Sequence, residues 1–218
     1  MSPEERKQKS EQKIQEKGIA VHPFLPLIES SNDVTLKDLD TVCKRAVAAL
    51  LSIQAAFEIH NQNYSEVKFF IDLMNTFGVR DALNKIEHKV INGTCSQQDI
   101  VDVVWEYECC WALFWALGLV DDIEDADTIC DCEQAIHFVC DCKTYEEFKS
   151  KCQLRNIEEI LDMLDLHYRY HWAVVEQEHI NPELPIGNLN PEVVFERRRG
   201  LEWLISKESD WHDISLDT

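Results

Sequence analysis

Helix start and stop signals recur along the whole chain, whereas strand signals are few. Ser2-Pro3-Glu4-Glu5 combines an N-cap, a first-turn proline and a capping box, and Gly18 follows where this helix should end. Similar start signals come later, at Asn63, Ser96, Thr144 and Asn190. Between these signals, apolar residues recur at spacings of three and four, as they do on one face of a helix. The sequence therefore predicts an all-α fold.

The same signals divide the chain into about eight helices of a single-domain, non-repeat bundle. We expect an N-terminal helix over residues 1–18, an extended connector over 19–36 and a helical core over 38–218, with the single domain covering 1–218. Within the core, the expected helices cover residues 38–59, 63–78, 79–90, 96–117, 155–179 and 190–206, with shorter helices from 133 and 144. The stretch from Ile100 to Leu117 leaves little polar face, so this helix should lie at the centre of the core.

The chain is strongly acidic, and the acidity is concentrated in one stretch. Its 218 residues include 41 acidic and 21 basic side chains, a net charge of −20 that disfavours binding to nucleic acids and anionic membranes. Residues 96–147 hold fourteen acidic residues and one lysine, and so carry most of this excess. Such a stretch is either a solvated surface that aids solubility or a docking face for a basic partner protein or a divalent cation.

Several features predict a cytoplasmic protein. The segment from Met1 to Lys17 is charged throughout and lacks the apolar core of a signal peptide. No stretch reaches the roughly 20 apolar residues that a membrane span needs. Nine cysteines, an odd number, fit reduced thiols better than a disulfide framework.

Opposite charges alternate at helical spacing on the long helix expected over 155–179. Asp165 and Arg169 are four residues apart, and the run from Glu196 to Arg199 brings further guanidinium groups from the last helix. One interpretation is a network of salt bridges between helices that sets the packing geometry. The other is a polar pocket between the last two long helices, formed by the following residues: Asp162, Asp165, Arg169, His171, Glu196 and Arg197. In such a pocket Arg169 or Arg197 would bind an anionic ligand and a carboxylate would act as a base.

Metal sites are also considered. His167 and His171 have the spacing of two zinc ligands, but Tyr168 stands where a zinc hydrolase has its glutamate, so packed histidines are favoured. Four cysteines, Cys130, Cys132, Cys140 and Cys142, form two pairs with a single residue between the partners. Structural zinc sites usually have two to four residues there, so we favour thiols packed as small apolar groups over metal or redox chemistry. We therefore predict no cofactor.

Two further features point to close packing rather than chemistry. Cys109 and Cys110 lie inside the expected central helix, where they should be buried and inert. Gly200 lies inside the last helix, where it should allow another helix to approach closely.

A set of residues spread over nearly the whole chain forms a recognisable family pattern. Its members are Leu154-Arg155, Glu159-Ile-Leu-Asp162, Asp165, Tyr168-Arg169, His171-Trp172-Ala173, Glu196-Arg197, Leu201, Trp203, Trp211 and Asp217-Thr218, together with Gly18-Ile19, Arg45, Trp105, Glu108 and Trp115-Ala-Leu-Gly118 upstream. In these residues the chain resembles the uncharacterised bacterial family DUF4272, a domain of unknown function. The resemblance covers nearly the whole chain and implies a stand-alone bacterial domain. The family brings no established activity, and the cysteine pairs are not part of its pattern.

Three hypotheses follow from these features. The first is a non-enzymatic, acidic helical protein that binds a basic protein, in a regulatory or immunity-type role. The alternative is a hydrolase or small-ligand-binding protein that uses the polar pocket between the last two long helices. The third, metal binding by the cysteine pairs, ranks last.

Overall fold

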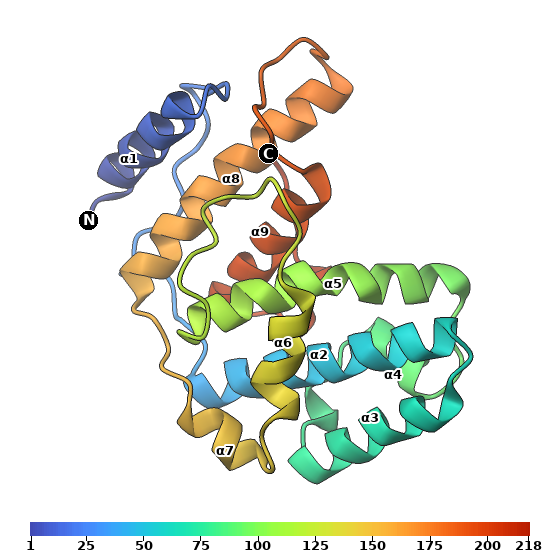
Figure 1. Cartoon of the computed structure of the whole chain (residues 1–218). Coiled ribbons are helices and arrows are strands. Elements are labelled where there is room, and N and C mark those ends of the chain that lie inside the picture. Colours follow the sequence, from blue (N-terminus) through green and yellow to red (C-terminus); the bar gives the residue numbers. More distant parts are fainter.

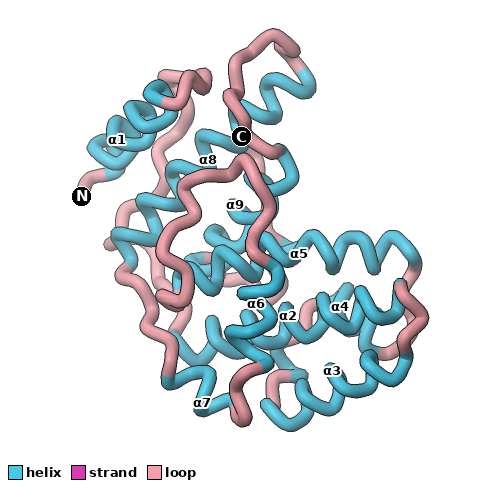
Figure 2. Tube along the Cα trace, in the orientation of Figure 1, coloured by secondary structure: helices cyan, strands magenta, loops and turns pink.

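Helices make up the regular structure of the chain, and no strand is present. The computed structural model describes residues 1–218. Its nine α-helices are α1 (Pro3–Glu16), α2 (Leu39–His60), α3 (Tyr64–Phe77), α4 (Lys85–Ile91), α5 (Gln97–Ala116), α6 (Cys132–Cys140), α7 (Tyr145–Ser150), α8 (Ile157–His179) and α9 (Pro191–Ile205). Two short 3₁₀ helices, η1 (Arg80–Ala82) and η2 (Trp211–Asp213), complete the list. The all-α prediction is confirmed (Figures 1 and 2).

Local capping explains most of the helix boundaries. Ser2 forms the capping box predicted for α1, and Ser96, predicted as the N-cap of α5, also forms a capping box; each side chain accepts a hydrogen bond from the third helical amide. Gly18 follows the C-cap of α1 and has a φ of +70°, a backbone conformation that glycine adopts at little cost because it has no Cβ. Asn63 precedes α3 as predicted, but its side chain makes no capping hydrogen bond.

The helix predicted over 79–90 is interrupted. Leu83 is extended, and Asn84 starts α4 with a capping box of its own, in which Glu87 bonds back to the Asn84 amide. The segment therefore forms η1 followed by α4. The apolar periodicity runs through this break, so periodicity alone could not reveal it.

The central position predicted for α5 is confirmed. Helix α5 packs against both α2 and α9, while α8 packs on α9 and α1 packs on α8 (Figure 1). The buried apolar residues form one continuous cluster of 58. Gly200 on α9 faces Cys109 on α5 so closely that an added Cβ would lie 2.7 Å from the Cys109 carbonyl oxygen. The close helix packing predicted for Gly200 is thus confirmed.

Long segments without regular structure connect the helices. Figure 2 shows four of them: the connector after α1, the segment between α5 and α6, the segment between α8 and α9, and the C-terminal tail. Residues 117–131, between α5 and α6, cross in front of α8 and α9 in Figure 1. We call this segment the acidic loop. None of the helices combines the length and the apolar composition that a membrane crossing requires.

Candidate functional site

Asp165 and Arg169 form a closed ion pair inside the molecule. Both belong to α8, and their exposed fractions are 0% and 2%. The Arg169 guanidinium donates two hydrogen bonds, of 2.9 and 2.7 Å, to the two oxygens of Asp165. Glu11 of α1 approaches Arg169 to 3.8 Å. Asp165 therefore takes the Nε and Nη2 side of the guanidinium fork, and the buried Nη1 faces Glu11 without a hydrogen bond.

Glu196 and His171 have separate partners. Glu196 accepts hydrogen bonds of 2.6 and 2.7 Å from Arg199 and one of 3.0 Å from the Cys109 thiol. Burial raises the pKa of Glu196. His171 accepts a hydrogen bond at Nδ1 from Arg198, and burial together with this guanidinium lowers the His171 pKa to about 4. A neutral histidine is the form that can accept this bond.

The last two predicted pocket residues, Asp162 and Arg197, lie apart from these groups and from each other. Asp162 lines a cavity on the α1 side of α8, described below. Arg197 bonds to Glu108 of α5 at 2.8 Å and reaches the acidic loop. The structure thus distributes the six predicted residues over separate ion pairs and hydrogen bonds and does not bring them together around one cavity between α8 and α9.

Buried polar side chains hold the acidic loop in place. Arg197 donates to the carbonyl oxygens of Asp125 at 2.6 Å and Thr128 at 3.2 Å. The Cys130 amide donates to Glu108 at 2.6 Å. These bonds satisfy loop backbone groups that no secondary structure pairs.

The beginning of the loop is held in the same way. Arg155 donates to the carbonyls of Val120 at 3.1 Å and Asp121 at 3.2 Å. His167 lies 3.0 Å from the Ile123 carbonyl through Nε2, and burial lowers its pKa to about 3. Because a carbonyl only accepts, the neutral ring carries its proton on Nε2. The loop is therefore an ordered surface element despite its fifteen residues without a helix.

The carboxylates of this region face water. Asp121 and Asp127 on the loop and Glu133 at the start of α6 are exposed, and their side chains make no ion pair or hydrogen bond. We call these three carboxylates the acidic face. Ile129, in the same stretch, is 60% exposed. The segment thus carries three exposed carboxylates without ion pairs and one exposed apolar side chain on a fixed backbone.

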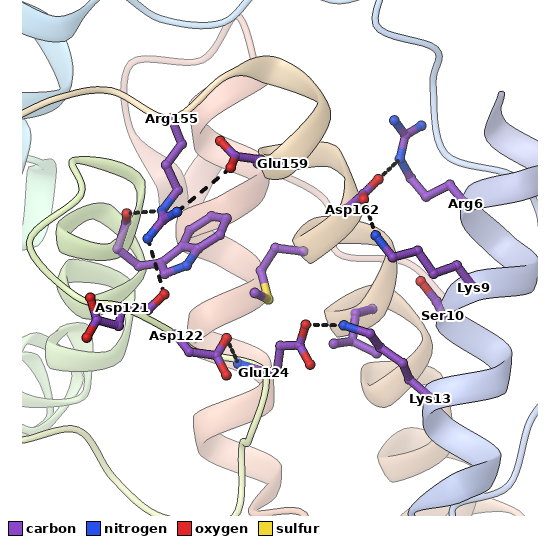
Figure 3. A pocket seen from close by; sticks show the side chains of 13 residues that line it. Arg6, Lys9, Ser10, Lys13, Asp121, Asp122, Glu124, Arg155, Glu159 and Asp162 are labelled. Atoms are coloured by element: carbon purple, nitrogen blue, oxygen red, sulfur yellow. Dashed lines mark hydrogen bonds and ion pairs between the residues drawn. The ribbon is translucent and has the colours of Figure 1, made fainter. Parts of the chain in front are cut away.

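A charged pocket lies between the acidic loop, α1 and α8 (Figure 3). Its volume is about 220 Å³. Thirteen residues line it: Arg6, Lys9, Ser10, Lys13, Trp115, Asp121, Asp122, Glu124, Arg155, Glu159, Asp162, Met163 and Leu166. Figure 3 shows cations from α1 pointing toward carboxylates of α8 and of the loop.

Ion pairs across this pocket attach α1 to the rest of the molecule. Arg6 is fully buried and bonds to Glu158 at 2.5 Å and Asp162 at 2.9 Å. Lys9 also bonds to Asp162, at 2.7 Å, and Lys13 pairs with Glu124 of the loop (Figure 3). The Nη1 atom of Arg6 is buried without a hydrogen-bond partner.

A second polar cluster was not predicted from the sequence. Arg45 pairs with Glu87, and Glu106 accepts hydrogen bonds from Asn84 at 2.6 Å and from Trp211 at 3.2 Å. Burial raises the pKa of Glu87 to about 8 and of Glu106 to about 7. The cluster fastens α4 and the C-terminal tail to α2 and α5. The sequence did contain a signal for this cluster: Arg45 on α2 and Glu106 on α5 are each a charged residue on an otherwise apolar helix face.

The four candidate metal cysteines do not converge. Cys132 begins α6 and Cys140 ends it, which separates the two pairs by about 12 Å along the helix axis. No group of three or more histidine, cysteine or acidic side chains has the geometry to hold a metal ion. Cys109 and Cys110 are fully buried, as predicted. All nine cysteines are free thiols.

The family match agrees with the resemblance drawn from the residues. A family model described as a domain of unknown function (DUF4272) matches residues 6–214. No curated protein and no solved structure matches the chain. The family description names no activity, so function must be argued from the geometry given above.

Proposed function

The chain belongs to the DUF4272 family, and we propose that it is a non-enzymatic interaction protein that binds a basic segment of another protein through the acidic face. The role would be regulatory or immunity-type. The proposed setting is the cytoplasm of a bacterium, for which the nine free thiols are the supporting observation.

One observation carries the proposal: carboxylates without partners stand on a backbone that buried side chains hold. The side chains of Asp121, Asp127 and Glu133 are exposed and form no ion pair with a cation of this chain. The buried guanidinium of Arg197 contacts loop carbonyl oxygens and leaves these carboxylates free. A cationic partner would be attracted to these carboxylates over about the distance of a Debye length.

The fixed loop also lowers the entropic cost of binding. A mobile acidic segment would have to be ordered when a partner docks, whereas an ordered one is already arranged. Ile129 offers an apolar contact beside the charges, and such a contact adds affinity that salt does not screen. We therefore expect the preferred ligand to be a basic segment with an apolar side chain.

The test compares two triple variants of equal net charge. In one, the acidic face is neutralised by Asp121→Asn, Asp127→Asn and Glu133→Gln. In the control, three exposed and unpaired carboxylates elsewhere are neutralised, namely Glu66, Glu178 and Glu183, each changed to Gln. The probe is a synthetic peptide of lysines with one central leucine, titrated by fluorescence anisotropy at low and high salt.

We expect the acidic-face variant to bind the peptide on the order of tenfold more weakly than the native chain, since each exposed charge contact contributes up to about 1 kcal/mol. The control variant should lose less than about twofold, because only long-range attraction changes. Equal losses in the two variants would show that net charge alone attracts the peptide, and the proposal would fail. If only the acidic-face variant loses binding, native mass spectrometry of the untagged chain from its own host would identify the natural partner.

A second function, the binding of a small anion, is supported by the charged pocket, which Arg6, Lys9 and Lys13 of α1 line. The probes are inorganic phosphate and citrate, titrated by calorimetry. Binding that is lost in Arg6→Met but kept in Arg80→Met, a variant of an exposed arginine outside the pocket, would support this function. No heat with either anion would remove it.

A further inference from the structure

Two thiols lie next to each other where the acidic loop enters α6. The sulfur atoms of Cys130 and Cys132 are 3.9 Å apart. Cys130 is 7% exposed, whereas Cys132 is half-buried and is reached from solvent. We propose that Cys130 and Cys132 form a redox-active dithiol that exchanges with disulfides of positively charged molecules. This inference does not depend on the proposed function.

The two thiols have different roles because their environments differ. Cys132 is the first residue of α6, where the unpaired amides of the helix N-terminus favour negative charge. The contact with the Cys130 thiol lowers the Cys132 pKa, against the opposing effects of burial and of the carboxylates Glu108 and Asp131. The same contact and burial raise the pKa of Cys130. Cys132 is thus the attacking thiol and Cys130 the resolving thiol.

The surrounding charge selects the substrate. Asp127, Asp131 and Glu133 are exposed close to Cys132 in the chain, and Glu108 lies behind Cys130, whose amide it binds at 2.6 Å. An anionic disulfide is repelled by these carboxylates, and a cationic one is concentrated near them. The matching substrate class is therefore a disulfide flanked by ammonium or guanidinium groups, on a small molecule or on a basic peptide.

The reaction balances without a further reagent. The Cys132 thiolate attacks one sulfur of the disulfide R–S–S–R, forms a mixed disulfide with one R–S group and expels the other as a thiolate. Cys130 then loses its proton and attacks the Cys132 sulfur, which expels the second R–S group. The chain loses two hydrogens and gains one disulfide, and the substrate is reduced to two thiols.

The experiment uses the full chain, fully reduced and freed of reductant. It is treated with cystamine, which is cationic, or with the neutral 2-hydroxyethyl disulfide, and the products are followed by intact mass and peptide mapping. Cys95 is the matched control, because it is also half-buried and has no thiol at hydrogen-bonding distance. The expected product is a chain that lacks two hydrogens, with the bridge mapped to Cys130 and Cys132.

The charge preference is measured as the rate of reaction with cystamine divided by the rate with the neutral disulfide. Cystamine should react at Cys132 at least about tenfold faster than the neutral disulfide at low ionic strength, and the difference should shrink with added salt. The same ratio measured at Cys95 corrects for the intrinsic reactivity of the reagents. Cys130→Ser should stop at the mixed disulfide on Cys132, whereas Cys132→Ser should leave Cys130 unreacted.

Three results would overturn the inference. Oxidation could link other cysteines, such as Cys43 with Cys152; Cys132 could react no faster than Cys95; or the cystamine preference could be the same at both sites. The mapping and the rates are measured on the native chain, so they decide the matter even if a serine variant does not fold.

Discussion

Replacing Arg169 by methionine tests whether the ion pair inside α8 is structural. The substitution keeps most of the side-chain volume and leaves the Asp165 carboxylate, which is 0% exposed, without its guanidinium partner. Both hydrogen bonds to Asp165 come from Arg169, so no other protein group replaces them. Breaking a buried pair from one side costs roughly 3–5 kcal/mol, a large share of the stability of an ordinary domain.

The matched control is another ion pair at the same helical spacing, whose side chains are exposed to solvent. Lys68 and Asp72 are also four residues apart, on α3, but their side chains are 75% and 59% exposed. Lys68→Met should change the free energy of unfolding by less than about 1 kcal/mol. The difference between the two single variants therefore isolates the effect of burial. Urea denaturation followed by tryptophan fluorescence measures both.

A double variant tests whether the loss of stability comes from the unpaired buried charge. Asp165→Leu combined with Arg169→Met removes both charges and should recover most of the loss, because neither charge is left uncompensated. If Arg169→Met alone stays within about 1 kcal/mol of the native chain, the structural reasoning is wrong. If Arg169→Met keeps its fold but no longer binds an anion that the native chain binds, Arg169 belongs to a binding site, as the polar-pocket hypothesis predicted.

The remaining predictions concern packing and pH. Gly200→Ala should lower the free energy of unfolding by about 1–3 kcal/mol, because the new Cβ would meet the Cys109 carbonyl at 2.7 Å; a neutral effect in urea denaturation would contradict the packing. Glu87 and Glu106 have pKa values of about 8 and about 7 in the folded chain, against an ordinary 4.5, so the folded state binds more protons than the unfolded one in this window. Their contribution to stability should therefore be present below about pH 4.5 and be lost as the pH rises toward 8. Glu87→Gln should flatten this part of the stability profile, and an unchanged slope in urea denaturation from pH 5 to 8 would count against the raised pKa values.

Local signals predicted the helices well because each signal acts within a few residues. The capping boxes at Ser2 and Ser96 determine where α1 and α5 begin, whatever the rest of the chain does. The break at Asn84, which was not predicted, also has a local signal, because Asn84 and Glu87 have the spacing of a capping box. There the apolar periodicity on both sides obscured the cap.

Partners across the core could not be predicted in the same way. Helical spacing shows which residues share a face, but not what lies opposite that face. The consecutive residues Arg197, Arg198 and Arg199 point in different directions and bind Glu108, His171 and Glu196, respectively. Spacing could indicate only pairs within one helix, such as Asp165 with Arg169 and Glu196 with Arg199. The polar pocket expected between the last two helices required every charge to face one point, which α9 does not allow.

A variant of Arg155 tests whether the acidic loop serves solubility or recognition. An acidic segment that only aids solubility has no need of a fixed backbone, yet Arg155 binds the loop carbonyls of Val120 and Asp121. Arg155→Met would make the chain one unit more negative while it releases the start of the loop. If net charge attracts the basic peptide, this variant binds more tightly; if the ordered acidic face does, it binds more weakly, because the loop must be ordered on binding. The sign of the change decides between the two explanations without any estimate of its size.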